Sequence, residues 1–266
     1  MRSQVGKPVS ETEFVQTAEA AARKAAVVLQ SWAKKFTVSE KSRSNLVTEA
    51  DLAAQQTIHE HIRGRFPEHS FLGEEGLVET NRDSPFRWLI DPLDGTLNYV
   101  HHFPYYAVSI ALECDGEMIA GVVYDPNRDE MFSAVRGGGA TLNGRELHTS
   151  TAATLAEAFV VASLPVAVEA DDPTVQSFLR VLPKAQTVQR TGSAALNLSY
   201  VAAGRIDAYW SASLKPWDMA AGILLVREAG GRVSTMAGRA FNVEVPDLLS
   251  SNGTSVHESL QQLLSE

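Results

Sequence analysis

The sequence is poor in cysteine, in basic charge and in long apolar runs. Cys114 is the single cysteine among 266 residues, which excludes an internal disulfide and suits a reducing cytoplasm. Lys and Arg number 23 against 32 Asp and Glu, and the net charge of −9 disfavours nucleic acid, which requires a basic surface. No apolar run approaches the roughly 20 residues of a membrane span, and the start, MRSQVGKPVSETEF, lacks the apolar core of a signal peptide. These absences predict a cytoplasmic protein with no nucleic-acid or membrane partner.

The remaining composition is that of a globular protein, with 44% hydrophobic and 21% charged residues. Apolar residues at helical spacing predict helices at 11–35 and about 50–65. Short runs between turn signals predict an antiparallel meander at 105–147. Beyond 150, strands alternate with helices: strands at 158–164, 185–191, 205–210, 231–236 and 247–253, and helices at 172–182, 193–204, 217–230 and about 255–264. This order predicts a mixed α/β fold, a single domain over 1–266 with lobes of about 1–150 and 151–266.

The stretch WLIDPLDGT, residues 88–96, places two carboxylates at the end of an apolar run. Pro92 favours extended backbone at Asp91, and Asp94-Gly95 is a turn dipeptide. We therefore expect a strand that ends at Ile90 and a sharp turn that holds both carboxylates close together. Such carboxylates repel each other unless positive charge lies between them. The alternative is an acidic turn whose aspartates cap the next element.

Further acids lie beside breakers or at the predicted ends of elements: Asp51, Glu74, Glu75 and Asp218. Taken singly, Asp51 and Asp218 are better explained as acids at helix N-termini, and the glutamates as a solvated loop. Together they suit Mg²⁺, which takes oxygen ligands from carboxylates and from a substrate phosphate. Two such ions can activate water and stabilise the leaving oxygen of a phosphate ester.

In order along the chain, GEE, DPLDGTLNYVH, GSAALN and LKPWDMAAG resemble the inositol monophosphatase family of magnesium-dependent, lithium-inhibited phosphatases. The resemblance covers nearly the whole chain and includes VVYDPNRDEMFSAVRGGGATLNGREL. It implies a layered α/β/α/β/α sandwich, a homodimer, Mg²⁺ as the cofactor and a small phosphate ester as the substrate.

The resemblance also implies a role for each matching residue. The metal ligands would be Glu74, Asp91, the carbonyl of Leu93, Asp94 and Asp218, with Asp91 bridging two ions and Glu74 helping to hold a weaker third ion through water. Catalysis would use Glu74, Thr96 to orient the attacking water, and Asp51 as the partner of Thr96. Substrate would contact Asp94, Gly95, Thr96, Ser193, Ala194, Ser211 and Asp218. Backbone N–H groups of Gly95 and Thr96 would bind the phosphate.

One position departs from the family pattern. Inositol-specific relatives carry a glutamate seven residues before the aspartate of the Trp-Asp pair, where it binds polyol hydroxyls, and this chain has Ser211 there. Lys215 follows four residues later in a loop that could face the substrate. The sequence therefore predicts intact metal chemistry with altered substrate choice.

The expected function is a magnesium-dependent phosphomonoesterase acting on myo-inositol 1-phosphate or a similar polyol or sugar phosphate. The same chemistry on histidinol phosphate, fructose 1,6-bisphosphate or a nucleotide 3′-phosphate is the alternative within enzymes. A metal-binding regulatory protein that retains the fold is the alternative outside them, and a two-metal nuclease is disfavoured by the net charge of −9.

Overall fold

A computed structural model describes residues 11–35, 37–42 and 45–265. The α-helices of this part are α1 (Glu11–Trp32), α2 (Glu49–Arg65), α3 (Thr96–Val100), α4 (Pro173–Val181), α5 (Ala194–Ala202), α6 (Pro216–Glu228) and α7 (Val256–Leu264). None of the described helices is long and apolar enough to cross a membrane. The helices expected from apolar spacing are present within a few residues of their predicted bounds.

The described strands form two large sheets and one hairpin. The hairpin is β1 (Val38–Ser42) with β2 (Asn45–Thr48). The first sheet has the order β10-β9-β8-β7-β6-β5-β3-β4, and only the β3–β5 pair in it is parallel. Its strands are β3 (Ser70–Gly73), β4 (Val78–Glu79), β5 (Phe86–Asp94), β6 (Ala107–Cys114), β7 (Glu117–Asp125), β8 (Glu130–Val135), β9 (Gly139–Leu142) and β10 (Arg145–Glu146).

The second sheet has the order β12-β11-β13-β15-β14. Its strands are β11 (Phe159–Ser163), β12 (Thr187–Gln189), β13 (Ala208–Ser211), β14 (Arg232–Ser234) and β15 (Leu248–Ser251). β11 runs parallel to both β12 and β13, whereas β15 is antiparallel to its neighbours. The carboxyl ends of β11, β12 and β13 therefore lie at one edge of this sheet.

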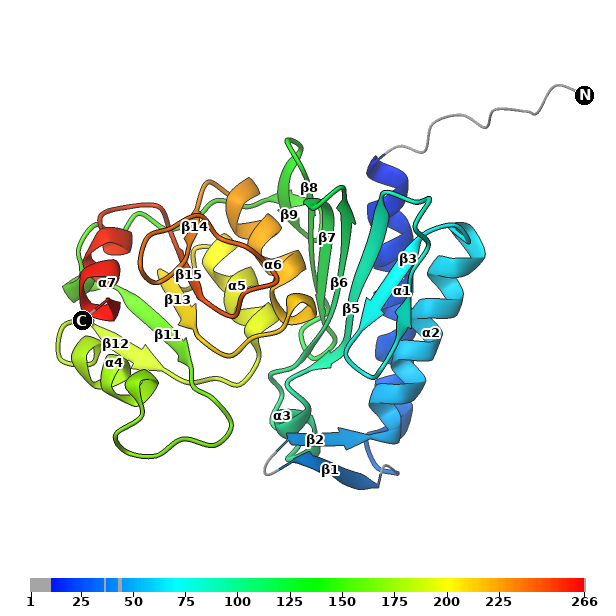
Figure 1. Cartoon of the computed structure of the whole chain (residues 1–266), viewed down its shortest axis with the longest axis horizontal. Coiled ribbons are helices and arrows are strands. Elements are labelled where there is room, and N and C mark those ends of the chain that lie inside the picture. The colour runs from blue at the N-terminus through cyan, green and yellow to red at the C-terminus, as the bar shows by residue number, and fades with distance from the viewer. Residues whose placement is uncertain (1–10, 36, 43–44, 266) are drawn as a thin grey trace, which may run out of the picture.

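Five layers follow one another across the molecule (Figure 1). α1 and α2 cover the outer face of the first sheet, α5 and α6 lie between the two sheets, and α4 and α7 cover the second sheet. Gly121 of β7 permits the close approach of α6, since a Cβ there would lie 3.0 Å from the backbone of Ala221. The predicted layered α/β/α/β/α sandwich is confirmed, and this packing fixes α6 against the sheet that contains Asp91 and Asp94.

The predicted end of the strand at Ile90 is wrong. β5 continues through Pro92 to Asp94, with Asp91 opposite Ser109 and Asp94 opposite Ala107 on β6. The pairing is irregular between these points because β5 has one more residue than β6 there. A bulge of this kind tolerates a proline within a strand. The turn begins only at Gly95, whose φ of 100° is left-handed.

Candidate active site

The irregular end of β5 positions two buried carboxylates. Asp91 is 1% exposed and Asp94 is 9% exposed. The Leu93 N–H donates to Asp91 Oδ1 at 3.0 Å, which holds the strand in its bulged path. This hydrogen bond fixes the direction of the Asp91 carboxylate. Both aspartates therefore lie at a defined place at the end of β5.

Asp94 also joins the first sheet to the helices between the sheets. Its Oδ2 accepts from Ser193 Oγ at 2.5 Å and from the Ala195 N–H at 2.7 Å, and its Oδ1 accepts from the Ala194 N–H at 3.2 Å. These donors form the first turn of α5, where unpaired N–H groups and the helix dipole favour an anion. Asp94 therefore accepts hydrogen bonds at the helix N-terminus, where the sequence predicted that Ser193 and Ala194 would face substrate.

Two further acids approach the same point from other elements. Asp218 lies in the first turn of α6 and accepts from the Lys215 N–H at 2.7 Å. Glu74 follows β3, and its N–H donates to the carbonyl of Ile90, next to Asp91. The structure thus brings together Glu74, Asp91, Asp94 and Asp218, which are separated by up to 144 positions in the sequence.

The electrostatics of these acids show how closely they interact. Burial, and then the charges of Glu74, Asp94 and Asp218, raise the pKa of Asp91 well above its usual value. Burial raises the pKa of Asp94 to about 6, against the opposing effect of its three hydrogen bonds. Burial and the charge of Asp94 likewise raise the pKa of Asp218 well above its usual value. Without a cation, the buried aspartates resist ionisation.

Thr96 and Asp51 form a separate polar contact beside these acids. The Thr96 hydroxyl lies 3.1 Å from Asp51 Oδ1 and 3.1 Å from the Leu93 carbonyl oxygen. Asp51 Oδ2 accepts from the N–H and hydroxyl of Thr48 at 2.8 and 2.6 Å, a capping box at the start of α2. Asp51 is fully buried, and burial raises its pKa. Asp51 therefore both caps α2 and contacts Thr96, two roles that the sequence left as alternatives.

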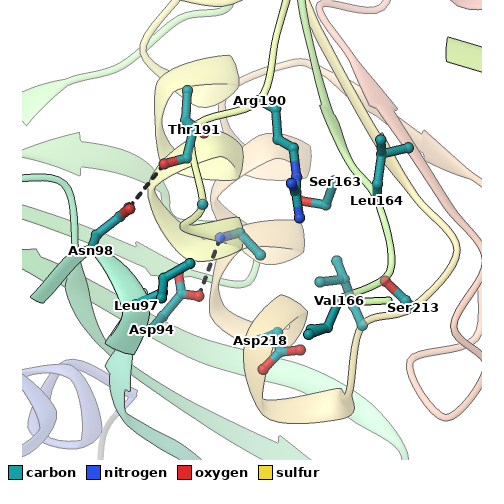
Figure 2. Close-up of a pocket in the computed structure, with 13 residues that line it drawn as sticks. Asp94, Leu97, Asn98, Ser163, Leu164, Val166, Arg190, Thr191, Ser213 and Asp218 are labelled. Atoms are coloured by element: carbon teal, nitrogen blue, oxygen red, sulfur yellow. Dashed lines mark hydrogen bonds between the residues drawn. The ribbon is translucent and has the colours of Figure 1, made fainter. Parts of the chain in front are cut away.

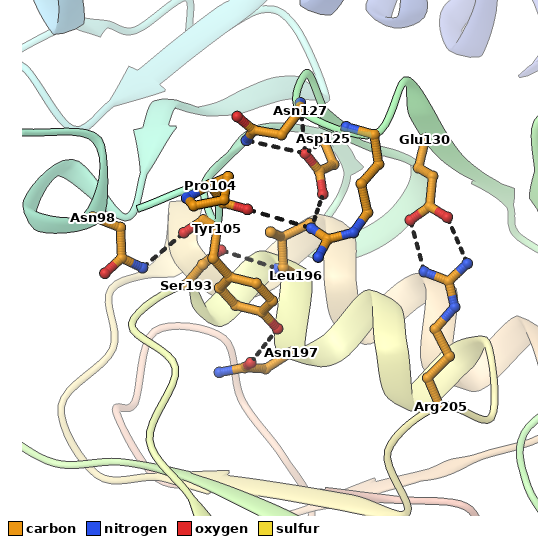
Figure 3. A network of polar contacts seen from close by, with 11 residues as sticks. Asn98, Pro104, Tyr105, Asp125, Asn127, Glu130, Ser193, Leu196, Asn197 and Arg205 are labelled. Carbon is orange, nitrogen blue, oxygen red and sulfur yellow. Dashed lines mark hydrogen bonds and ion pairs between the residues drawn. The ribbon is translucent and has the colours of Figure 1, made fainter. Parts of the chain in front are cut away.

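Gly95 brings the end of β5 against the loop before α5. A Cβ at this position would lie 3.1 Å from the Tyr105 carbonyl oxygen and 3.3 Å from that of Gly192, and the left-handed φ also favours glycine. Asn98 Nδ2 donates to the carbonyls of Tyr105 and Thr191, at 2.7 and 2.9 Å. The hydroxyl of Tyr105 donates to Asn197 of α5 at 2.8 Å (Figure 3). This network fixes two loops to each other, and the sequence did not predict it.

A cleft of about 490 Å³ opens beside the acids, a size typical of small-molecule sites. Figure 2 shows Asp94 and Asp218 facing it from one side and Arg190 pointing into it from another. Of the predicted site residues, Asp94, Ala194 and Asp218 line the cleft; Asn98, Ser163, Arg190, Thr191, Gly192 and Ser213 also line it. Arg190 carried no sequence signal, because only the meeting of separate strand ends brings it there.

Ser211 lies differently from the expectation. It ends β13, is fully buried, and is not among the residues that line the cleft. Its hydroxyl accepts from the Ser213 N–H at 3.4 Å, while Ser213 lines the cleft. The serine side chain is shorter than the family's glutamate by two bonds and remains below the wall of the cleft, so direct contact with substrate is not supported.

The residues present fit a divalent cation by their chemistry. Glu74, Asp91, Asp94, Asp218 and the Leu93 carbonyl supply only oxygen donors, which Mg²⁺ prefers. The raised pKa values of the buried aspartates mark a place where added positive charge is favourable. Within the described residues, no three His, Cys, Asp or Glu side chains already stand as a preformed metal-binding group.

Comparisons with known proteins identify the family of this chain. The model of the inositol monophosphatase family matches residues 10–266. The inositol-1-monophosphatase of Synechocystis is 41% identical over 97% of this chain and 92% of its own. The Nus factor SuhB of Escherichia coli is 40% identical over 86% of each chain.

The fold of this chain is also similar to solved structures. The extragenic suppressor protein suhB of Bartonella henselae has a TM-score of 0.90 at 36% identity, over 95% of this chain and 98% of that one. The inositol monophosphatase of Anabaena has a TM-score of 0.85 at 36% identity, over 96% of both chains. The family model and the similar inositol-1-monophosphatases support a phosphatase. The chain belongs to the inositol monophosphatase family.

Proposed function

We propose that this protein is a magnesium-dependent phosphomonoesterase that hydrolyses a small polyol or sugar phosphate, with myo-inositol 1-phosphate as the first substrate to test. The observation that carries the proposal is the convergence of Glu74, Asp91, Asp94 and Asp218 beside the cleft, with the pKa of each of the three aspartates raised by burial and by neighbouring charge. Membership of a phosphatase family and a similar inositol-1-monophosphatase from Synechocystis support the same conclusion.

Each residue has a role in the proposed reaction. Glu74, Asp91, Asp94, Asp218 and the Leu93 carbonyl would hold Mg²⁺, which supplies a more acidic water and neutralises charge on the phosphate and leaving oxygen. Thr96, held by Asp51, accepts a hydrogen bond from the attacking water and directs it in line with phosphorus. Gly95 and the N–H groups at the start of α3 bind phosphate oxygens. Ala194 forms part of the wall beside the alcohol, together with Gly192 and Thr191.

No covalent phospho-enzyme is needed. A nucleophilic side chain would require an activating base within hydrogen-bond reach. The Thr96 hydroxyl shares Asp51 with the capping box of α2. The Ser193 hydroxyl is buried and donates to Asp94 at the N-terminus of α5. Water is therefore the proposed nucleophile.

The test is phosphate release from a panel of esters: inositol 1-phosphate, histidinol phosphate, fructose 1,6-bisphosphate and a nucleotide 3′-phosphate. Each is assayed after chelation, with Mg²⁺ restored, and with lithium or excess Mg²⁺ added. We expect no release after chelation, recovery with Mg²⁺, and inhibition by lithium. Asp83→Asn, a change in an exposed loop, is the control for loss of one carboxylate. Full activity in chelator would overturn the proposal.

A regulatory protein that retains the fold is the second candidate, favoured by the relatives named Nus factor SuhB. Under it, Mg²⁺ would raise the melting temperature while no ester in the panel released phosphate. We further propose a homodimer located in the cytoplasm, the first testable by light scattering after gel filtration and the second by cell fractionation. A monomer at assay concentration would contradict the first part.

A further inference from the structure

Three parallel strands end at the cleft. β11, β12 and β13 point their carboxyl ends to the same edge of the second sheet. The cleft is lined by the residues at or after those ends: Ser163 and Leu164, Arg190 and Thr191, Ser213 and Leu214. Loops at the carboxyl ends of parallel strands are where α/β sheets bind ligands. This edge is therefore a binding wall distinct from the acids supplied by β5.

Arg190 gives this wall its charge. Among the described residues that line the cleft, the charged ones are Asp94, Asp218 and Arg190. Figure 2 shows the Arg190 guanidinium extending into the cleft beside Ser163. No hydrogen bond or ion pair joins the Arg190 side chain to another of the described residues. The guanidinium thus presents its donors to the cleft, in a planar array that matches phosphate or carboxylate oxygens.

Ser211, where the family pattern has a glutamate, also bears on the charge at this wall. Ser211 of β13 lies opposite Ser163 of β11 in the parallel pairing. β11 lies between β13 and the strand that precedes Arg190, and Ser211 is neutral, so position 211 adds no charge that opposes that of Arg190.

We propose that Arg190, with Ser163 and Ser213, binds a second anionic group of the substrate, a phosphate or a carboxylate, while the reacting phosphate lies at the acids. The preferred substrates are then small phosphate esters that carry a further anionic group. The proposal rests on the phosphomonoesterase function above for the reacting end, but the anion site itself does not require turnover.

The experiment compares substrates that differ only in the second group. One pair is fructose 1,6-bisphosphate and fructose 1-phosphate; the other is 3-phosphoglycerate and glycerol 3-phosphate, in which a carboxylate replaces a hydroxymethyl group. For wild type we expect a higher kcat/KM for the anionic member of each pair. In Arg190→Gln this ratio should fall on the order of tenfold to hundredfold, mainly through KM, as expected for loss of charge-assisted hydrogen bonds. Arg190→Lys should restore part of it.

The control is Arg82→Gln, which removes an exposed arginine in the loop before β5 and should leave the ratio unchanged. Calorimetry of fructose 1,6-bisphosphate with chelator-treated protein gives a reading without hydrolysis; Arg190→Gln should weaken Kd about tenfold. If Arg190→Gln lowers both members of each pair equally, Arg190 binds the reacting phosphate and the inference is wrong. If wild type releases no phosphate but the calorimetric difference persists, the proposed function fails and the anion site stands.

Discussion

Replacement of Asp94 by asparagine should reduce activity and, without metal, stabilise the protein. The change removes one charge from a site where burial raises the pKa of Asp94 to about 6 from a usual value of 3.8. By linkage, ionising this side chain costs the folded state about 3 kcal/mol. The asparagine keeps one carbonyl oxygen for Ser193 and Ala195 but turns its NH₂ toward the Ala194 N–H, which costs about 1 kcal/mol.

The two pKa values of Asp94, folded and unfolded, determine how the stability of the protein changes with pH. A carboxyl whose pKa is raised on folding loses stability as pH rises from about 4 to about 6, and the loss is complete above the folded pKa of about 6. After chelation, Asp94→Asn should therefore be more stable than wild type by about 2 kcal/mol at pH 8, or about 5 °C in melting temperature. At pH 4 this advantage should disappear, because Asp94 is then largely protonated.

The activity of Asp94→Asn, unlike its stability, should fall. Loss of a metal-ligand charge at unchanged shape should lower kcat on the order of 10²-fold, comparable to the loss of a preorganised electrostatic group. Thermal unfolding at pH 4 and 8, with chelator or Mg²⁺, and phosphate release at pH 8 provide the measurements. Unchanged turnover, or equal destabilisation at both pH values, would show that Asp94 serves only to anchor α5.

Three other predictions follow from described contacts. Thr96→Ala should lower kcat about 10²-fold with little change in KM, and Thr96→Ser should recover part of the loss; equal rates would remove Thr96 from the mechanism. The His257 ring hydrogen-bonds to Ser234 and Ser251, and burial lowers the pKa of His257 to about 4. Because the unfolded chain takes up a proton near pH 6.5 and the folded chain does not, the free energy of unfolding should fall as pH falls from about 6.5 to 4. His257→Gln should abolish this dependence in urea unfolding. Ser211→Glu should raise kcat/KM for inositol 1-phosphate about tenfold if the carboxylate reaches the cleft; a lowered melting temperature with unchanged specificity would mean that the charge stays buried.

The sequence predicted the regular parts of this fold and the acids that the structure brings together, whereas their role as metal ligands stays a prediction. α1 and α2 follow from apolar spacing, and the acids at helix starts follow from their position beside breakers. The path of β5 through Pro92 was missed, because bulge pairing depends on the partner strand β6. The position of Arg190 at the cleft was missed because it depends on how the parallel strands of the second sheet align. Local sequence carries little information on such distant alignment.

The separation of the acids from the ends of β11, β12 and β13 has a consequence for how relatives diverge. Changes at the residues after these strand ends alter the wall of the cleft without touching the bulge of β5 or the capping box of α2; these residues are Ser163, Leu164, Val166, Arg190, Thr191, Ser213 and Leu214. A gene lineage can therefore drift from one phosphate ester to another by exchanging a few loop residues, while its hydrolytic apparatus remains intact. An exchange at Arg190 or Ser213, which line the cleft, is the kind of step by which such a lineage would acquire a new metabolic niche.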